Sequence, residues 1–120
     1  MIKTFKDLVV WQEAMNLVEM IYLQTKTFPK EEMYGLTSQI RRAAVSIPAN
    51  IAEGNGRGSR KEYLRFLSVA NGSLTELETH ILIAERLNFL TKEISEKIQI
   101  QLKLVGRLLI GLKKSLVPVP

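Results

Sequence analysis

The sequence predicts an all-α protein, an antiparallel up-down four-helix bundle that forms a single domain over residues 1–120. Three observations lead to this fold class. Apolar residues recur at spacings of three and four in four separate segments, which is the period of one helix face. The connections between these segments are short, and short connections favour antiparallel neighbours. No segment shows the alternating pattern that predicts a β-strand.

The first helix is predicted over residues 7–26. Its apolar stripe consists of Leu8, Trp11, Met15, Val18 and Tyr22. A second set of apolar residues widens this face and consists of Val10, Ala14, Leu17 and Ile21. Phe28-Pro29 ends the helix, because the residue before a proline avoids the α region.

The second helix is predicted over residues 35–53. Its stripe consists of Leu36, Ile40, Ala43, Ala44, Ile47 and Ile51. Pro48 removes a backbone hydrogen bond and clashes with the carbonyl of Ala44, which costs about 3 kcal/mol in an ideal helix. We expect a kink there and not a break, because the apolar pattern resumes at Ile51. Gly54 is expected to cap the end of the helix.

The third and fourth helices are predicted over residues 59–87 and 91–114. Ser59 and Glu62 have the spacing of a capping box, in which each side chain bonds the other residue's backbone amide. The stripe of the third helix consists of Tyr63, Phe66, Leu67, Ala70, Leu74, Leu77, Ile81 and Ala84. Thr91 is expected to cap the fourth helix. Residues 115–120 are expected to form a loose tail, because two prolines end the chain.

The fourth helix carries more apolar surface than one bundle face needs. At 100° per residue, its main stripe fills an arc of about 80°. That stripe consists of Ile94, Ile98, Leu102, Val105, Leu109 and Leu112. Ile100, Leu104 and Leu108 fall on an adjacent arc, which brings the apolar face to roughly 200°. We expect these three residues to form an oligomer interface; the alternative is that the fourth helix lies deep in its own bundle.

Composition excludes several classes of protein. The chain has no cysteine, which rules out disulfides, thiolate metal sites and thiol catalysis and fits a cytoplasmic location. The N-terminal residues do not read as a signal peptide, and no stretch approaches the roughly 20 apolar residues of a membrane span. We therefore expect no membrane association.

No pattern of an active site is present. His80 is the only histidine, so it lacks a second ligand for a metal site of the kind found in bundle cores. No pair of acids has a pattern that selects for proton transfer, and Glu53 is interpreted first as an ion-pairing or capping residue. We therefore predict no catalytic residue, metal, cofactor or small-molecule substrate, and expect that the protein is not an enzyme.

Positive charge is the main functional signal. The net charge is +5, and the last 30 residues alone carry +4. Arg57, Arg60, Lys61 and Arg65 cluster where a helix N-terminus offers free amides, which indicates contacts with phosphates. A solvated turn is the alternative interpretation. Arg41 and Arg42 form a second basic pair, but they lie about 100° apart on their helix and cannot easily share a partner.

The residues also resemble a known family. The segment 34–54, which reads YGLTSQIRRAAVSIPANIAEG, is its central signature, and residues 5–12, 58–63 and 72–79 add further matches. The chain resembles the bacterial four-helix bundle proteins called 23S rRNA-intervening sequence proteins. It is also similar to the accessory variability protein of diversity-generating retroelements. The resemblance implies a bundle that assembles as a homopentamer, and in the second case a protein that engages nucleic acid. It implies no catalytic residue, and the molecular function of the first family is not established.

Residues of the signature also have a structural explanation. Asn50 and Glu53 follow Pro48 by about one turn, so they could satisfy backbone groups that the kink exposes.

Two functions remain open. The first is a non-enzymatic oligomer that binds nucleic acid, with RNA preferred over DNA. Its phosphate contacts would come from a set of basic residues on the third and fourth helices, namely Arg57, Arg60, Lys61, Arg65, Lys103, Arg107 and Lys113. The second is a protein-interaction scaffold or adaptor whose basic surface meets an acidic protein partner.

Overall fold

The computed structural model describes residues 2–118 and confirms the all-α four-helix bundle. The helices are α1 (Val9–Thr25), α2 (Leu36–Asn55), α3 (Arg60–Arg86) and α4 (Lys92–Leu116). Two short 3-10 helices, η1 (Phe5–Asp7) and η2 (Lys30–Glu32), were not predicted from the sequence.

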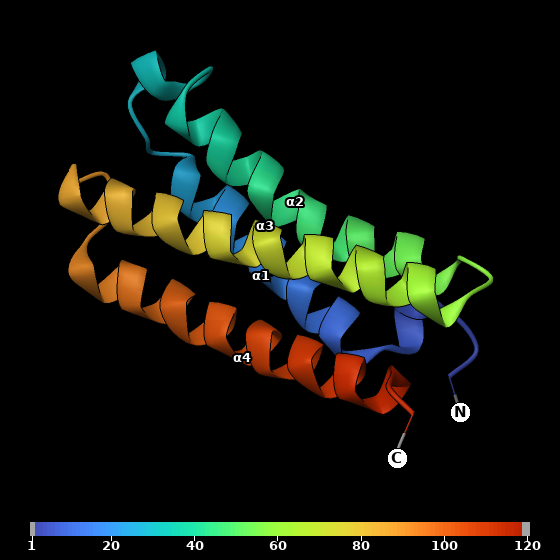
Figure 1. Cartoon of the computed structure of the whole chain (residues 1–120). Coiled ribbons are helices and arrows are strands. Elements are labelled where there is room, and N and C mark those ends of the chain that lie inside the picture. Colours follow the sequence, from blue (N-terminus) through green and yellow to red (C-terminus); the bar gives the residue numbers. More distant parts are fainter. Residues whose placement is uncertain (1, 119–120) are drawn as a thin grey trace.

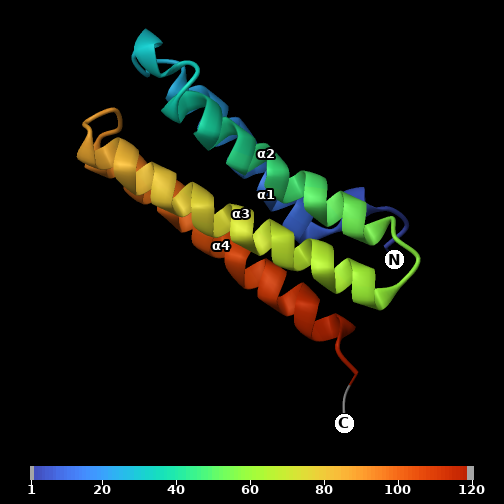
Figure 2. The same ribbon diagram turned by 45° about the horizontal axis from the view of Figure 1, so that its top comes forward.

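The helices run up and down along a common direction and form a body of 48 × 24 × 23 Å (Figure 1). Consecutive helices pack against each other, and α1 also packs against α4. Figure 2 shows α1 beside α2 and α3 beside α4. The described ends of the chain therefore lie at the same end of the bundle as the α2–α3 turn (Figure 1).

The helix ends follow local capping chemistry. Thr4 and Asp7 form a capping box around η1, and Leu8 then adopts an extended conformation, so α1 begins at Val9. The Thr91 hydroxyl accepts a hydrogen bond from the amide of Ile94 at 3.2 Å, which confirms the predicted cap of α4. This last helix extends to Leu116, two residues beyond the prediction, and so shortens the expected tail. Residues 119–120 of that tail lie outside the described part of the chain.

The core is built from one apolar stripe of each helix. On α1 the buried residues are Val10, Ala14, Leu17 and Ile21, which the sequence analysis treated as the wider margin of the face. Of the expected main stripe, Leu8 is buried and Trp11 and Val18 pack against the edge of the core, whereas Met15 and Tyr22 remain 36% and 40% exposed. The small Ala14 at the centre of the buried stripe has no exposed surface.

The second helix continues without a break through the buried Pro48. Pro48 leaves the carbonyl of Ala44 without its usual amide donor. The Asn50 side chain instead donates hydrogen bonds of 2.8 Å to the carbonyl of Ser46 and 2.9 Å to its hydroxyl. The hydroxyls of Ser46 and Ser73 lie 2.8 Å apart and link α2 to α3. The Glu53 carboxylate pairs with Arg57, so neither predicted residue bonds the carbonyl that the proline exposes.

Gly54 is not the cap that the sequence analysis predicted. The helix extends to Asn55, and Gly56 occupies the cap position. A Cβ atom on Gly54 would lie 2.8 Å from the Cβ of Phe66 and 3.1 Å from the Tyr63 ring. The glycine therefore permits the close approach of α2 and α3 near the turn that joins them.

Candidate nucleic-acid interface

The candidate interface includes the first turn of α3 and its helix cap. The Ser59 hydroxyl accepts a hydrogen bond from the amide of Glu62 at 3.1 Å, as expected for a helix cap. The second half of the predicted capping box is absent, because the Glu62 carboxylate accepts from Arg65 Nε at 2.8 Å and Nη2 at 3.4 Å. The Ser59 half of the predicted capping box is therefore confirmed and the Glu62 half is wrong. Glu62 instead orients Arg65 on the surface.

Two of the predicted basic residues are held in place by internal contacts. Arg57 pairs with Glu53 at 3.1 Å, and Arg65 pairs with Glu62 at 2.8 Å. Both guanidinium groups also lie over the ring of Phe66, with Cζ atoms 5.0 Å and 4.5 Å from the ring centroid. Such cation–π contacts restrict the side chains and leave the outer edge of each guanidinium available for hydrogen bonds.

The pair of Glu62 and Arg65 keeps both groups ionised. The hydrogen bond from Arg65 lowers the pKa of Glu62 below its usual value of 4.5. The same hydrogen bond raises the pKa of Arg65 above its usual range. Both side chains are exposed, so solvent screens the interaction, which orients the arginine more than it stabilises the fold.

Arg60 and Lys61 differ from these two arginines. Both side chains are exposed, and neither forms an ion pair or a hydrogen bond with another residue of the segment 2–118. Glu62 attracts the charge of Lys61 through space, but neither basic group is held in a direct contact with an acid. Of the predicted cluster, these two residues are the most available to an external anion.

The end of α4 brings further basic residues toward this turn. The Lys113 ammonium donates a hydrogen bond of 3.3 Å to the hydroxyl of Ser68, which places the last turns of α4 against the beginning of α3. Arg107 lies less than two turns before Lys113 and is exposed. Lys103 lies farther away, where it borders a groove with Thr75 and Glu78 near the middle of the bundle. Six of the seven predicted residues therefore fall in one half of the molecule.

We call this half, formed by residues 2–17, 45–74 and 106–118, the basic half. It contains nine of the 17 lysines and arginines but four of the 12 acids, so it carries +5 while the rest of the chain carries no net charge. Its basic residues are Lys3, Lys6, Arg57, Arg60, Lys61, Arg65, Arg107, Lys113 and Lys114. Its four acids are all engaged: Glu53 and Glu62 in ion pairs, Asp7 with the amides of Lys3 and Thr4, and Glu13 with the side-chain amides of Gln101 and Asn16.

The predicted oligomer surface is only partly free. Ile100 is 69% exposed, whereas Leu104 and Leu108 are half-buried and Leu108 packs against the core. The neighbouring Gln101 donates hydrogen bonds of 2.9 Å to the carbonyl and carboxylate oxygens of Glu13 on α1. Part of the broad apolar face of α4 is therefore covered within its own bundle.

Two negative observations limit the chemistry of the described residues. Within the segment 2–118, no three side chains of His, Cys, Asp or Glu are grouped so that they could hold a metal ion. His80 lies 3.2 Å from Glu76 in the i, i+4 arrangement of one helix. None of the helices within this segment is both long and apolar enough to cross a membrane.

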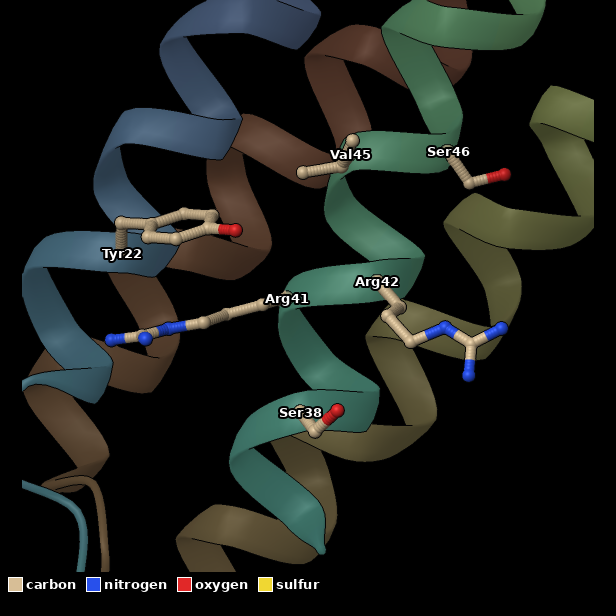
Figure 3. Close-up of a pocket in the computed structure, with 6 residues that line it drawn as sticks. All are labelled: Tyr22, Ser38, Arg41, Arg42, Val45 and Ser46. Carbon is tan, nitrogen blue, oxygen red and sulfur yellow. The ribbon is translucent and has the colours of Figure 1, made fainter. Parts of the chain in front are cut away.

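The sequence analysis did not assign a site to the outer groove between α1 and α2. Tyr22, Ser38, Arg41, Arg42, Val45 and Ser46 border a groove of about 550 Å³. Figure 3 shows that Arg41 extends toward α1 below Tyr22, whereas Arg42 points the other way. The angular separation of the two arginines on a helix predicted that they point in different directions. The contacts of Arg41 with α1 could not be predicted in this way, because they join residues 16 or more positions apart.

Comparison with known proteins identifies a family and similar solved structures. The profile of the family described as 23S rRNA-intervening sequence protein matches residues 6–111. A similar crystal structure is that of a protein of unknown function from the S23 ribosomal protein family of Bacteroides thetaiotaomicron. It shares 26% sequence identity and a TM-score of 0.79, over 88% of this chain and 99% of that chain. No curated protein matches the chain.

Proposed function

The chain belongs to the 23S rRNA-intervening sequence protein family, and we propose that it is a non-enzymatic protein that binds RNA through its basic half. The separation of charge carries the proposal: the basic half holds +5, and the rest of the chain holds no net charge. Polyanions are attracted to such a surface, and lysines and arginines neutralise backbone phosphates in nucleic-acid complexes. The reference to rRNA in the family description supports RNA as the nucleic acid.

The geometry of the turn supports phosphate contacts in particular. Arg57 and Arg65 are oriented by their acids and by Phe66, so little side-chain freedom would be lost when they bind. Arg60 and Lys61 supply charges that form no direct ion pair with an acid of the segment 2–118. Arginine donors in a fixed orientation suit the paired oxygens of a phosphate.

The protein is further proposed to act as a homo-oligomer, with Ile100 at the centre of the interface and Leu104 and Leu108 beside it. The 69% exposure of Ile100 supports this proposal. A pentameric ring would present five basic halves to one RNA and so raise the apparent affinity of a weak site. The similarity to the accessory variability protein, a pentameric bundle, stays a prediction.

Fluorescence anisotropy with a structured RNA, a DNA duplex and single strands tests the RNA proposal. The Arg60→Glu/Lys61→Glu variant should lose RNA binding. The matched control, Lys92→Glu/Lys97→Glu, makes the same change of net charge in the other half and should retain most of it. Equal losses in the two variants would show that overall charge, and not the basic half, determines the binding.

The same assay separates RNA binding from the adaptor function. A protein adaptor would meet an acidic partner with the same surface and would bind none of the nucleic acids at low salt. Recovery of one stoichiometric protein in a pull-down that withstands nuclease treatment would then replace the RNA proposal.

A further inference from the structure

The aromatic ring of Phe66 supports two arginines at the α2–α3 turn. Arg57 comes from the turn itself and Arg65 from α3, and their Cζ atoms lie 5.0 Å and 4.5 Å from the ring centroid. Phe66 is half-buried, and it begins where α2 and α3 approach each other. A Cβ atom on Gly54 of α2 would lie only 2.8 Å from the Cβ of Phe66. The two guanidinium groups therefore lie over a ring that the packing of α2 on α3 holds in place.

The ion pairs of these arginines use the edges of the guanidinium groups and not their faces. The donors of a guanidinium lie in its plane. Glu62 accepts from Nε and Nη2 of Arg65 at 2.8 Å and 3.4 Å, and Glu53 lies 3.1 Å from Nη2 of Arg57. Phe66 covers one face of each group. The opposite faces take part in no hydrogen bond, ion pair or ring contact among the described residues, and the side chains of Arg57 and Arg65 are 46% and 58% exposed.

Contacts with an RNA backbone would leave these exposed faces unused. Phosphate oxygens accept from the in-plane donors of an arginine, as carboxylates do. Arg60 and Lys61, which form no direct ion pair within the segment 2–118, lie between the two oriented arginines in the sequence and supply charge for the backbone. A guanidinium whose edge is already paired can still contact a ligand through its face.

The face of a guanidinium is a surface on which a nucleobase stacks. Arginine is planar and more weakly hydrated than lysine, and RNA-binding proteins stack unpaired bases on aromatic rings or on arginine planes. Bases inside a duplex are covered on both sides by their neighbours, so they cannot reach such a surface. An exposed guanidinium face therefore distinguishes unpaired from paired bases, which positive charge alone does not.

From these observations we propose that Arg57 and Arg65 stack on unpaired bases of RNA. The inference rests on the proposed RNA binding by the basic half and names the part of the RNA that this surface selects. Arg60 and Lys61 attract the phosphates of any strand. The faces of Arg57 and Arg65 add affinity only where bases are free to stack, as in single strands and loops.

Fluorescence anisotropy with two matched strands tests the inference. One is a single-stranded RNA, and the other is an abasic strand of the same length with the same ribose-phosphate backbone. Both strands offer the same number of phosphates, so charge alone predicts equal affinities. The wild type should bind the base-containing strand at least about tenfold more tightly, which is the gain expected from stacked bases.

A variant that keeps the charge separates stacking from electrostatics. Arg57→Lys/Arg65→Lys retains both positive charges but removes both planar groups. It should bind the base-containing strand about as weakly as the abasic strand. Its salt slope should equal that of the wild type, because the number of neutralised phosphates is unchanged. Its affinity for an RNA duplex should change less than about twofold, because paired bases do not stack on the arginines.

Arg42→Lys/Arg86→Lys is the matched control. It makes the same exchange at two exposed arginines of the other half, and neither of them lies over an aromatic ring of the described chain. This control should bind the base-containing strand as tightly as the wild type.

Side-chain NMR detects the stacking directly. The Nε–H proton signals of Arg57 and Arg65 should move upfield when the base-containing strand is added, because the ring current of a stacked base shields protons above its plane. The abasic strand should not produce this shift.

The outcomes separate this inference from the proposed function on which it rests. No binding of either strand at low salt would overturn RNA binding and the inference together. Salt-dependent binding of both strands with equal affinity would leave RNA binding intact and overturn the stacking. A preference for the base-containing strand that persists in Arg57→Lys/Arg65→Lys would also overturn it.

Discussion

At the scale of single residues, the charged groups of the surface are distinguished by their partners. Arg57 and Arg65 each form an ion pair with an acid and lie over an aromatic ring, whereas Arg60 and Lys61 form neither contact among the described residues. Four basic residues that are close in the sequence are therefore two oriented groups and two groups that are not held by a contact. The sequence predicted that these four basic residues lie close together. It did not predict the contacts of Arg57 and Arg65 with Phe66, because those contacts depend on side-chain conformations.

Gly54 gives a prediction for stability. Its replacement by alanine places a Cβ atom 2.8 Å from the Cβ of Phe66, so α2 and α3 must separate. Gly54→Ala should lower the free energy of unfolding by about 1–3 kcal/mol, the usual cost of overpacking. Urea denaturation followed by circular dichroism measures this change.

Gly72 is the matched control for that measurement. It lies inside α3, and a Cβ atom there meets no other atom within 4 Å. Gly72→Ala should therefore stabilise the protein by about 0.5–1 kcal/mol, because alanine favours the helix. A Gly54→Ala variant as stable as the wild type would contradict the close packing of α2 on α3.

The exposed acids give a prediction for pH. Hydrogen bonds from Arg65 lower the pKa of Glu62, and backbone amides of Lys3 and Thr4 lower the pKa of Asp7. In this range the folded chain therefore binds fewer protons than the unfolded chain. Its free energy of unfolding decreases as the pH is lowered. The contribution of Glu62 is present above pH 4.5, its usual pKa, and is lost as the pH falls through the lower folded value.

Thermal melting between neutral and acid pH measures this effect. Glu62→Gln should reduce the acid-induced fall of Tm. Glu78→Gln, which removes a carboxylate that forms no ion pair or hydrogen bond with another described residue, should leave the fall unchanged. The same acid dependence in wild type and Glu62→Gln would contradict the role of the Arg65 pair.

At the scale of the elements, apolar periodicity predicted the number, order and approximate bounds of the helices. It was less accurate about which side of α1 is buried. Two apolar sets lie on neighbouring sides of that helix, and the larger side chains suggested the wrong one as the main stripe. The structure buries the side that contains Ala14, because a small residue allows closer packing of the backbones.

The candidate sites differ in how far sequence alone could reveal them. The basic half follows from the up-down topology, because that topology brings the α2–α3 turn beside the last turns of α4. The outer groove between α1 and α2 does not follow from any spacing. It depends on the packing of the two helices, including the contact between Arg41 and Thr25, which are 16 residues apart.

The exposed side of α4 gives a prediction for assembly. Ile100 is 69% exposed, so a glutamate at this position should disturb an interface but not the core. Ile100→Glu should reduce the mass of the oligomer in analytical ultracentrifugation while the helical circular dichroism is unchanged. Ile110→Glu is the control, because Ile110 is 53% exposed on another side of the same helix. Loss of assembly in the control alone would move the interface to that side.

At the scale of the whole molecule, the proposed function rests on the separation of charge. The basic half carries the whole net charge of +5, and the other half carries none. A polyanion is therefore attracted to one end of the bundle and approaches it in a preferred orientation. Oligomerisation would place several such ends on one assembly.

The salt dependence of RNA binding tests this account most directly. The slope of log Kobs against log salt for a single-stranded RNA measures the number of phosphates that the protein neutralises, at about −0.7 per contact. The account predicts a steep slope in the wild type that becomes shallower by roughly 1 to 1.5 in Arg60→Gln/Lys61→Gln. The matched variant Lys92→Gln/Lys97→Gln should keep the wild-type slope. A wild-type affinity that is flat between low and physiological salt, or the same slope in all three proteins, would contradict RNA binding by the basic half.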